Sequence, residues 1–223
     1  MISLSSVRRA ARKRLKRFMG RLKGDYFDNV GAVTAQDLEV LTSAIDHLKP
    51  SLFIEIGTGK GFSTRGIFRY LTKNAPSCDF YTIDIFKEYL EKVGDEFRES
   101  PRFHTLHGLS VNREETTNPA FKELKSYSGP QNALRSLLDN QLKGRTVDIA
   151  FIDSRKGTAV PEFNVLAERL TPDGYIFCHD VLNGGKGVEL LAYLQDKKTD
   201  FRVEVLDTGP AGMMRIRRVN AAD

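Results

Sequence analysis

Acidic side chains stand at the ends of three short apolar runs in the sequence. Asp84 and Asp153 each close such a run, and Asp180 directly follows a third. Short apolar runs are typical of buried strands in a parallel sheet, and the carboxyl ends of those strands meet at one edge. Carboxylates gathered there can accept hydrogen bonds from hydroxyl groups or bind a cation. The three acids therefore mark the edge of the sheet where we expect chemistry.

A glycine-rich turn follows an earlier apolar run, Leu52 to Ile56. Gly57, Gly59 and Gly61 would let a ligand lie against the backbone, and the helix that begins after them can direct its N-terminus at that ligand. The spacing differs from the G-x-G-x-x-G of dinucleotide-binding turns. Asp84, at the end of the next strand, is positioned to accept both hydroxyls of a ribose. These features predict a nucleoside ligand with little recognition of phosphate.

The other two acids, Asp153 and Asp180, follow strands that we expect to be neighbours. They could share a divalent cation, and their hard oxygen ligands suit Mg²⁺ or Ca²⁺. His179, next to Asp180, could add a nitrogen ligand that favours a transition metal, or act as a general base. The structural alternatives are a capping or loop acid for Asp180 and a hydrogen-bonded scaffold residue for His179. The predicted metal ligands are Asp153, His179 and Asp180.

Strand and helix patterns alternate along the chain, which predicts a doubly wound α/β fold with a mostly parallel, seven-stranded sheet. A helix capped by Thr34 precedes the first strand. The last two strands are separated by a turn too short for a crossover helix, so we expect them to form an antiparallel pair. Residues 111–129 fit no periodic template and are expected to form a long loop. The predicted strands are 52–56, 80–85, 103–107, 147–153, 175–179, 201–206 and 213–219, and the helices between them are 62–73, 88–99, 161–170 and 187–196.

The 223 residues are 40% hydrophobic and 28% charged, which is typical of one globular domain. No apolar window is long enough to span a membrane, and the two distant cysteines, Cys78 and Cys178, cannot form a disulfide framework, so we expect a cytoplasmic protein. The net charge of +5 comes from the first 24 residues, which contain nine Lys and Arg and no acid. An excess of basic residues that is confined to one segment argues against a nucleic-acid-binding protein.

Residues 1–33 are expected to form an N-terminal arm, separate from a domain at 34–223. Val7, Leu15 and Leu22 belong to a set of apolar residues spaced by three and four positions, which predicts a basic amphipathic helix. Such a helix could attach to an anionic membrane surface and make the protein peripheral to a membrane. It could also be a solvated helix, a contact in a homodimer or an organelle presequence.

These motifs resemble those of the class I S-adenosylmethionine-dependent methyltransferases. The first motif of that superfamily, a strand followed by E/D-x-G-x-G-x-G, matches Glu55 and the three glycines, and the resemblance places Glu55 near the methionine amino group. Asp84 matches the ribose-binding acid, and Ser110 matches the small polar residue beside adenine in O-methyltransferases of the catechol and caffeoyl-CoA types. The resemblance covers residues 34–219 and implies a Rossmann-like methyltransferase fold. The cofactor-binding residues that it implies are Glu55, Gly57, Thr58, Gly59, Gly61, Phe62, Ser63, Asp84, Ile85, Ser110 and Asp153.

The resemblance extends to the acceptor side. Metal-dependent O-methyltransferases of this kind have an acid matched by Asp153 and a lysine three residues later matched by Lys156. They also have an Asp-Asn pair, of which only Asp180 is present because Val181 stands in place of the asparagine. The resemblance implies transfer of a methyl group from S-adenosylmethionine to a hydroxyl of a small-molecule acceptor. It implies Lys156, His179 and Asp153 as catalytic residues and Mg²⁺ or another divalent cation as a second cofactor.

Other classes of function fit only parts of the sequence. A Y-x-x-x-K motif at 193–197 occurs in NAD-dependent oxidoreductases, but here it falls in the helix after the fifth strand, and the glycine spacing differs. A non-catalytic S-adenosylmethionine-binding module would keep Glu55 and Asp84 and lose the acceptor-side residues, which this chain retains. No N/D-P-P-Y/F motif follows the fourth strand, which argues against a nucleic-acid methyltransferase. The sequence leaves the acceptor open.

Overall fold

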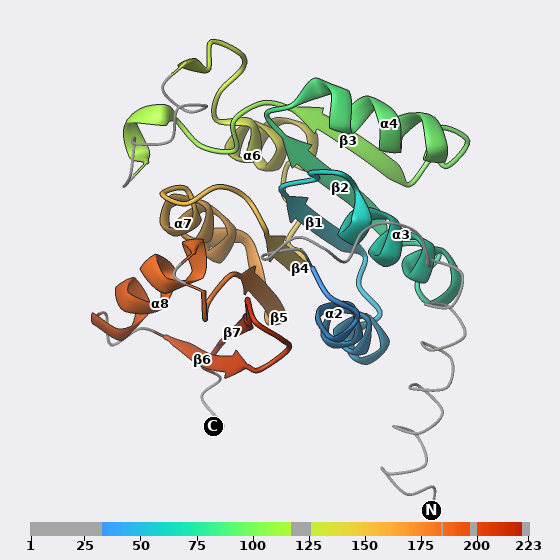
Figure 1. Ribbon diagram of the computed structural model, residues 1–223. Coiled ribbons are helices and arrows are strands. Elements are labelled where there is room, and N and C mark those ends of the chain that lie inside the picture. Colours follow the sequence, from blue (N-terminus) through green and yellow to red (C-terminus); the bar gives the residue numbers. More distant parts are fainter. Residues whose placement is uncertain (1–32, 117–125, 184, 197–199, 220–223) are drawn as a thin grey trace, which may run out of the picture.

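The computed structural model describes residues 33–116, 126–183, 185–196 and 200–219. In these residues seven strands form one sheet in the order β3-β2-β1-β4-β5-β7-β6 (Figure 1). The first five strands run parallel, and β7 is antiparallel to both β5 and β6. The predicted doubly wound fold, in which the last strand of the sequence is antiparallel, is confirmed. The strands are β1 (Leu52–Ile56), β2 (Asp79–Asp84), β3 (Phe103–His107), β4 (Val147–Ile152), β5 (Leu170–His179), β6 (Phe201–Leu206) and β7 (Met213–Arg218).

Helices cover both faces of the sheet (Figure 1). On one face lie α2 (Ala35–Leu48), α3 (Phe62–Asn74) and α4 (Lys87–Phe97). On the other lie α6 (Ala133–Ser136), the π-helical turn η2 (Leu137–Gln141), α7 (Ala159–Arg169) and α8 (Lys186–Asp196). Each face has its own hydrophobic core, and all five residues of β1 are buried between the two. This double cover explains the near-continuous apolar runs of the central strands.

The order of the strands reverses at β1. The chain builds outward from β1 through β2 to β3 and then returns to place β4 on the other side of β1. In open α/β sheets such a reversal leaves a crevice beside the carboxyl ends of the strands, where ligands bind. The glycine turn after β1, Asp84 at the end of β2 and the acids after β4 and β5 all stand at this edge, so the topology gathers residues as far apart in sequence as Gly57 and Asp180.

Two elements differ from the sequence prediction. Strand β5 begins at Leu170, five residues earlier than expected, because the turn-like residues after it form an irregularity within the strand. Val147 pairs with Leu170 and Ile149 pairs with Tyr175, so the intervening residues bulge out of the ladder. The short helical segment of α6 and η2 was not expected. In the predicted loop at 111–129, the described part contains one 3₁₀ turn, η1 (Arg113–Glu115), and residues 117–125 lie outside the described residues.

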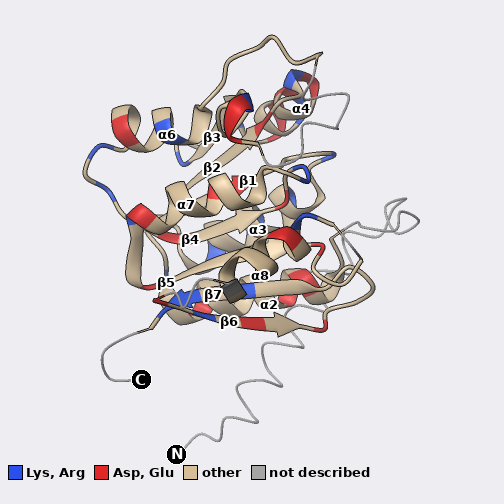
Figure 2. Ribbon diagram, turned by 90° about the vertical axis from the view of Figure 1, so that its left-hand side faces the viewer, with Lys and Arg blue, Asp and Glu red and all other residues tan. Residues whose placement is uncertain are grey.

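The predicted basic arm lies outside the described residues, apart from residue 33. Its amphipathic helix, its attachment to an anionic surface and its role in a homodimer therefore stay predictions. Within the described part of the chain, no helix is long and apolar enough to cross a membrane. Figure 2 shows acidic and basic residues mixed over the helices of this part.

Candidate active site

A cavity of about 700 Å³ opens beside the carboxyl ends of the five parallel strands. The structure brings most of the predicted site residues to its wall. Glu55, Gly61 and His179 do not line it. The predicted residues that do are Gly57, Thr58, Gly59, Phe62, Ser63, Asp84, Ile85, Ser110, Asp153, Lys156 and Asp180.

Close contact with the neighbouring strand shapes the glycine turn after β1. A Cβ atom on Gly57 would lie 2.2 Å from the backbone carbonyl oxygen of Asp153, and Gly57 has a φ of +99°, so no other residue fits here. Gly59 has a φ of +50° and faces open space. The turn therefore presents bare backbone to the cavity, where a ligand can approach closely.

Backbone donors hold Asp84 at the end of β2. Its Oδ2 atom accepts a hydrogen bond from the Gly59 N–H at 2.9 Å, and its Oδ1 atom accepts one from the Phe86 N–H at 2.9 Å. Each carboxylate oxygen keeps a further lone pair that can accept another hydrogen bond. Because Asp84 lines the cavity, this arrangement suits an acid that accepts two adjacent hydroxyl groups, as predicted for a ribose.

Glu55 lies behind the glycine turn and is fully buried within β1. Its carboxylate accepts hydrogen bonds from the hydroxyls of Ser63 and Thr64, both at 2.6 Å, and from Thr82 at 2.8 Å. Burial, opposed by these hydrogen bonds, raises the pKa of Glu55 to about 7. The observed contacts tie the start of α3 to the sheet. The contact with a ligand amino group that the resemblance implies stays a prediction.

Ser110 belongs to a buried hydrogen-bond cluster that sequence reasoning missed. Its hydroxyl donates to Glu162 Oε1 at 2.5 Å, and Ser154 donates to Glu162 Oε2 at 2.6 Å. Glu162 lies on α7, and burial raises its pKa. An acid in the first turn of a helix is ordinarily a favourable dipole partner, so nothing in the sequence indicates that Glu162 reaches the cavity wall.

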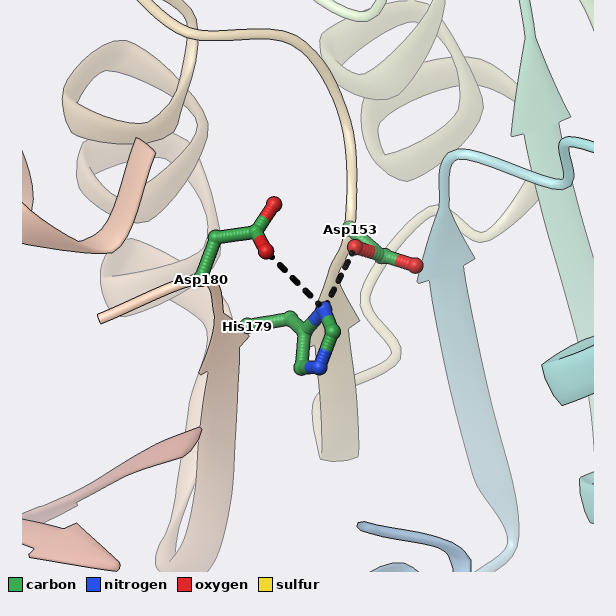
Figure 3. A group of neighbouring side chains, drawn as sticks. All are labelled: Asp153, His179 and Asp180. Atoms are coloured by element: carbon green, nitrogen blue, oxygen red, sulfur yellow. Dashed lines mark ion pairs between the residues drawn. The ribbon is translucent and has the colours of Figure 1, made fainter. Parts of the chain in front are cut away.

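His179, the last residue of β5, is buried among three carboxylates. Its Nδ1 atom lies 3.3 Å from Asp153 Oδ1 and 3.6 Å from Asp180 Oδ1 (Figure 3). On the other side of the ring, Nε2 lies 3.3 Å from Asp37 Oδ2 on α2. These separations are those of ion pairs and are long for hydrogen bonds. The candidate ligand atoms of Asp153, His179 and Asp180 all lie within 4.8 Å of one another, so the structure gathers the predicted metal ligands.

The neighbouring carboxylates set the charge of His179. Burial opposes the charged ring, but Asp153 and Asp37 outweigh it and raise the pKa of His179 to about 9. Despite their own burial, the pKa values of both acids stay below the usual range, because His179 and, for Asp153, Lys186 favour the ionised form. The raised pKa of His179 favours the charged form of the ring, and His179 does not line the cavity. Its role as a general base stays a prediction.

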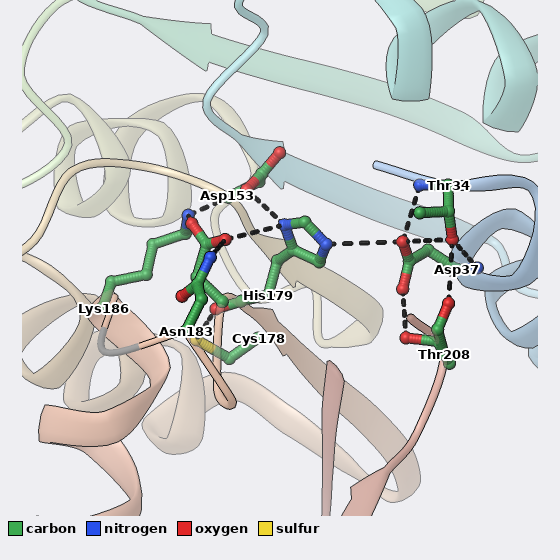
Figure 4. Close-up of polar contacts among 9 residues, drawn as sticks. Thr34, Asp37, Asp153, Cys178, His179, Asn183, Lys186 and Thr208 are labelled. Atoms are coloured by element: carbon green, nitrogen blue, oxygen red, sulfur yellow. Dashed lines mark hydrogen bonds and ion pairs between the residues drawn. The ribbon is translucent and has the colours of Figure 1, made fainter. Parts of the chain in front are cut away.

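Lys186, which was not among the predicted site residues, completes this cluster (Figure 4). Its Nζ atom lies 2.9 Å from Asp153 Oδ1 and 2.5 Å from Asp180 Oδ2, and its side chain is 5% exposed. Burial opposes its charge, but the two carboxylates raise the pKa of Lys186 above its ordinary value. Lys186 begins α8, where the helix dipole disfavours a cation. That unfavourable position is the signal in the sequence that could have marked it.

A divalent cation at this place would contact the same carboxylate oxygens as the ammonium. Mg²⁺ lies about 2.1 Å from its oxygen ligands, and Lys186 Nζ already lies 2.9 Å from Asp153 Oδ1. The asparagine expected after Asp180 is Val181, which is buried and offers no side-chain oxygen. The three predicted ligands do lie close together. The carboxylates of Asp153 and Asp180, however, already hold the ammonium of Lys186, and this arrangement does not fit a metal ion beside it.

A family model described as a methyltransferase domain matches residues 54–181, which is more than half of the chain. The chain belongs to this family. The matched range runs from β1 to the residue after Asp180, so it contains the glycine turn, Asp84 and both acids of the acceptor side. The expected class, an S-adenosylmethionine-dependent methyltransferase, is confirmed, and the NAD-dependent oxidoreductase alternative does not hold.

Solved structures of methyltransferases share this fold. The S-adenosylhomocysteine-bound methyltransferase of Podospora anserina is 14% identical with a TM-score of 0.60, over 95% of this chain and 88% of that chain. An O-methyltransferase of Bacillus cereus in complex with S-adenosylhomocysteine is 14% identical with a TM-score of 0.62, over 94% and 90%. The O-methyltransferase of tomaymycin synthesis from Streptomyces achromogenes, in complex with S-adenosylmethionine, is 15% identical with a TM-score of 0.60, over 95% and 90%. At these identities the likeness shows the common fold and leaves the acceptor open.

Proposed function

We propose that this protein transfers the methyl group of S-adenosylmethionine to a hydroxyl of a small-molecule acceptor. The observation that carries the proposal is the single cavity in which the glycine turn, Asp84 and the acids after β4 and β5 meet. Family membership supplies the reaction class, and similar structures described as O-methyltransferases favour a hydroxyl acceptor. The cavity thus has a nucleoside end at β1 to β3 and an acceptor end at β4 and β5.

At the nucleoside end, the chain offers groups suited to each part of the cofactor. Asp84 would accept the two ribose hydroxyls, while Ile85 and Ser110 would contact the adenine. The bare backbone of Gly57 and Gly59 would lie against the methionine portion. When bound, S-adenosylmethionine supplies an electrophilic methyl group on a positively charged sulfur. Asp153 and Asp180, after β4 and β5, line the same cavity and would then lie on the acceptor side.

At the acceptor end, Lys156 is the cavity-lining residue that we assign to take the proton of the acceptor hydroxyl. The hydroxyl oxygen forms a bond to the methyl carbon as the carbon–sulfur bond breaks, and the bonding electron pair stays on sulfur. Asp153 lines the same end, and its carboxylate is held by Lys186 at 2.9 Å and His179 at 3.3 Å. Positioning the oxygen close to the methyl is the main requirement of such a transfer.

Calorimetric titration of the protein with S-adenosylhomocysteine tests the nucleoside end. Asp84→Ala is expected to bind at least about 30-fold more weakly than wild type, because the loss of charge-assisted hydrogen bonds costs about 2 kcal/mol or more. Asp95→Ala removes an exposed acid of α4 and serves as the control, with unchanged affinity. NAD should not compete. Equal affinity of Asp84→Ala and wild type would rule out the ribose assignment.

Turnover with isotopically labelled S-adenosylmethionine and a mixture of small hydroxylated compounds tests the acceptor end. Mass spectrometry should find the labelled methyl on an oxygen atom. Lys156→Met should lower kcat by about 100-fold, because general base catalysis contributes on that order, and should leave the affinity for S-adenosylhomocysteine unchanged. A protein that binds S-adenosylhomocysteine and methylates nothing would be a non-catalytic binding module instead.

A further inference from the structure

Lys186 is a buried lysine whose ammonium bridges two carboxylates on neighbouring strand ends (Figure 4). We propose that Lys186 takes the place of a divalent cation at the acceptor end, so that the protein's own ammonium holds Asp153 and Asp180 and no metal ion is bound there. The consequence for turnover rests on the proposed methyl transfer, whereas the occupancy of the site by Lys186 does not. The structure assigns Lys186 as a positioning residue that acts through these two carboxylates.

The coordination geometry favours the ammonium. Asp153 and Asp180 direct one oxygen each at Lys186 Nζ, at 2.9 and 2.5 Å. The second oxygen of Asp180 accepts a hydrogen bond from Asn183 Nδ2 at 2.8 Å, so both of its oxygens have protein partners. A metal ion would need additional oxygen ligands at this point, and the buried Val181 supplies none from its side chain.

The balance of charge points the same way. The buried ammonium of Lys186 already faces the carboxylates of Asp153 and Asp180. A divalent cation bound to the same two carboxylates would lie beside this buried positive charge and be repelled by it.

The backbone around Lys186 is built to bring its side chain to this place. A Cβ atom on Gly187 would lie 2.7 Å from a side-chain methyl of Val181 and 3.0 Å from the carbonyl oxygen of His179. The glycine therefore allows the first turn of α8 to lie against the end of β5. Asp180 itself has a left-handed φ of +62°, which turns the chain sharply after the strand. These two features together direct the carboxylate of Asp180 and the ammonium of Lys186 at each other.

Metal binding without turnover is the deciding experiment, with Mn²⁺ as the probe because it binds at the oxygen ligands that Mg²⁺ prefers. Electron paramagnetic resonance measures free Mn²⁺ over the wild-type protein, Lys186→Met and Lys60→Met. Lys60→Met is the matched control, because it removes a different lysine from the wall of the same cavity. We expect Lys186→Met to bind one Mn²⁺ at least about tenfold more tightly than wild type and Lys60→Met. Asp180→Asn in the Lys186→Met background should abolish that binding.

Stability measurements cover the case in which Lys186→Met unfolds because two buried acids lose their partner. Added Mn²⁺ should then restore folding of Lys186→Met, since a ligand that binds only the folded state stabilises it. The melting temperature of wild type should not change with Mn²⁺. If Lys186→Met stays unfolded with Mn²⁺, the wild-type titration decides alone: absent binding supports the proposal, and stoichiometric binding overturns it.

Turnover provides an independent readout. Wild type and Lys186→Arg, which keeps the positive charge, should both methylate after exhaustive chelation of divalent ions. Loss of wild-type turnover on chelation, regained with Mg²⁺, would overturn the proposal. If no methyl transfer occurs under any condition, the proposed function fails, while the Mn²⁺ titration still decides whether Lys186 occupies the cation site.

Discussion

The two ends of the cavity are held together by different interactions. At the nucleoside end, backbone N–H groups hold Asp84 and hydroxyl groups surround Glu55. At the acceptor end, full charges face one another, and these are Asp37, Asp153, His179, Asp180 and Lys186. The nucleoside end therefore depends on the shape of the backbone, and the acceptor end depends on a balance of charge. The two ends should respond differently to substitution and to pH.

The glycine turn gives the largest expected effect and tests the dependence on shape. Gly57→Ala should destabilise the protein by more than about 4 kcal/mol, which is the range of severe backbone and packing conflicts, because its Cβ atom would lie 2.2 Å from a backbone oxygen at a positive φ. Gly59→Ala has no atom within 4 Å of its Cβ, so its left-handed backbone should cost only about 1 kcal/mol. Thermal unfolding monitored by circular dichroism measures both.

Gly59→Ala, the variant with the smaller expected loss of stability, should lose affinity for the ligand. The methyl group of Gly59→Ala would project into the cavity, so this well-folded variant should bind S-adenosylhomocysteine at least about tenfold more weakly than wild type. A stable Gly57→Ala protein with normal affinity would show that the backbone of Asp153, directly after β4, can move away from the turn. In that case the nucleoside end would not depend on the shape of the backbone.

The two ends should lose stability in different pH ranges, because Glu55 at one end and His179 at the other titrate at different pH values. The pKa of Glu55 is raised from 4.5 to about 7, so its contribution to folding is present below pH 4.5 and is lost as the pH rises through 7. The pKa of His179 is raised from 6.5 to about 9, so its contribution is present below pH 6.5 and is lost as the pH rises through 9. Each loss amounts to roughly 3 kcal/mol.

Urea unfolding at a series of pH values measures these two losses. Glu55→Gln should flatten the profile only in the lower window and His179→Gln only in the upper one, because each variant removes one titrating group. If His179→Gln kept the full loss of stability between pH 6.5 and 9, the imidazolium would not be held by its carboxylates, and the charge balance described for the acceptor end would be wrong.

The sequence predicted the nucleoside end well because that end is built from consecutive residues. Strand β1, the glycine turn and α3 follow one another, and the observed bounds of β1 are the predicted ones. Asp84 was identified because it closes the next strand along the chain. The contacts of Glu55 and the hydrogen bond from Ser110 to Glu162 were not foreseen, since they depend on the helices packed against the sheet.

The acceptor end was predicted only in part, because its partners come from distant segments. Asp153, His179 and Asp180 follow strand ends and could be read from local pattern. Asp37 comes from α2, and Lys186 comes from the start of α8. No spacing in the sequence indicates that these two charges approach the strand ends. A metal ion was therefore expected where the folded chain supplies an ammonium.

An effect smaller than the two pH-dependent losses is expected at the link between the acceptor end and the β6–β7 turn. The Thr208 hydroxyl donates a hydrogen bond to Asp37 Oδ1, and the Thr208 carbonyl accepts one from the Thr34 hydroxyl at 3.0 Å (Figure 4). Asp37 also completes the capping box of α2 with Thr34, so one carboxylate serves the helix, the turn and His179.

Thr208→Val keeps the shape of the side chain and removes only the donor to Asp37. It should destabilise the protein by about 2 kcal/mol, the usual contribution of a hydrogen bond to a charged group. Thr105→Val, at an exposed position of β3, is the control and should change stability by less than about 0.5 kcal/mol. Because Asp37 belongs to the charge cluster and touches no part of the glycine turn, the affinity of Thr208→Val for S-adenosylhomocysteine should equal that of wild type. A loss of that affinity in the folded variant would mean that the two ends are coupled through α2, and the separation between a shape-dependent and a charge-dependent end would not hold.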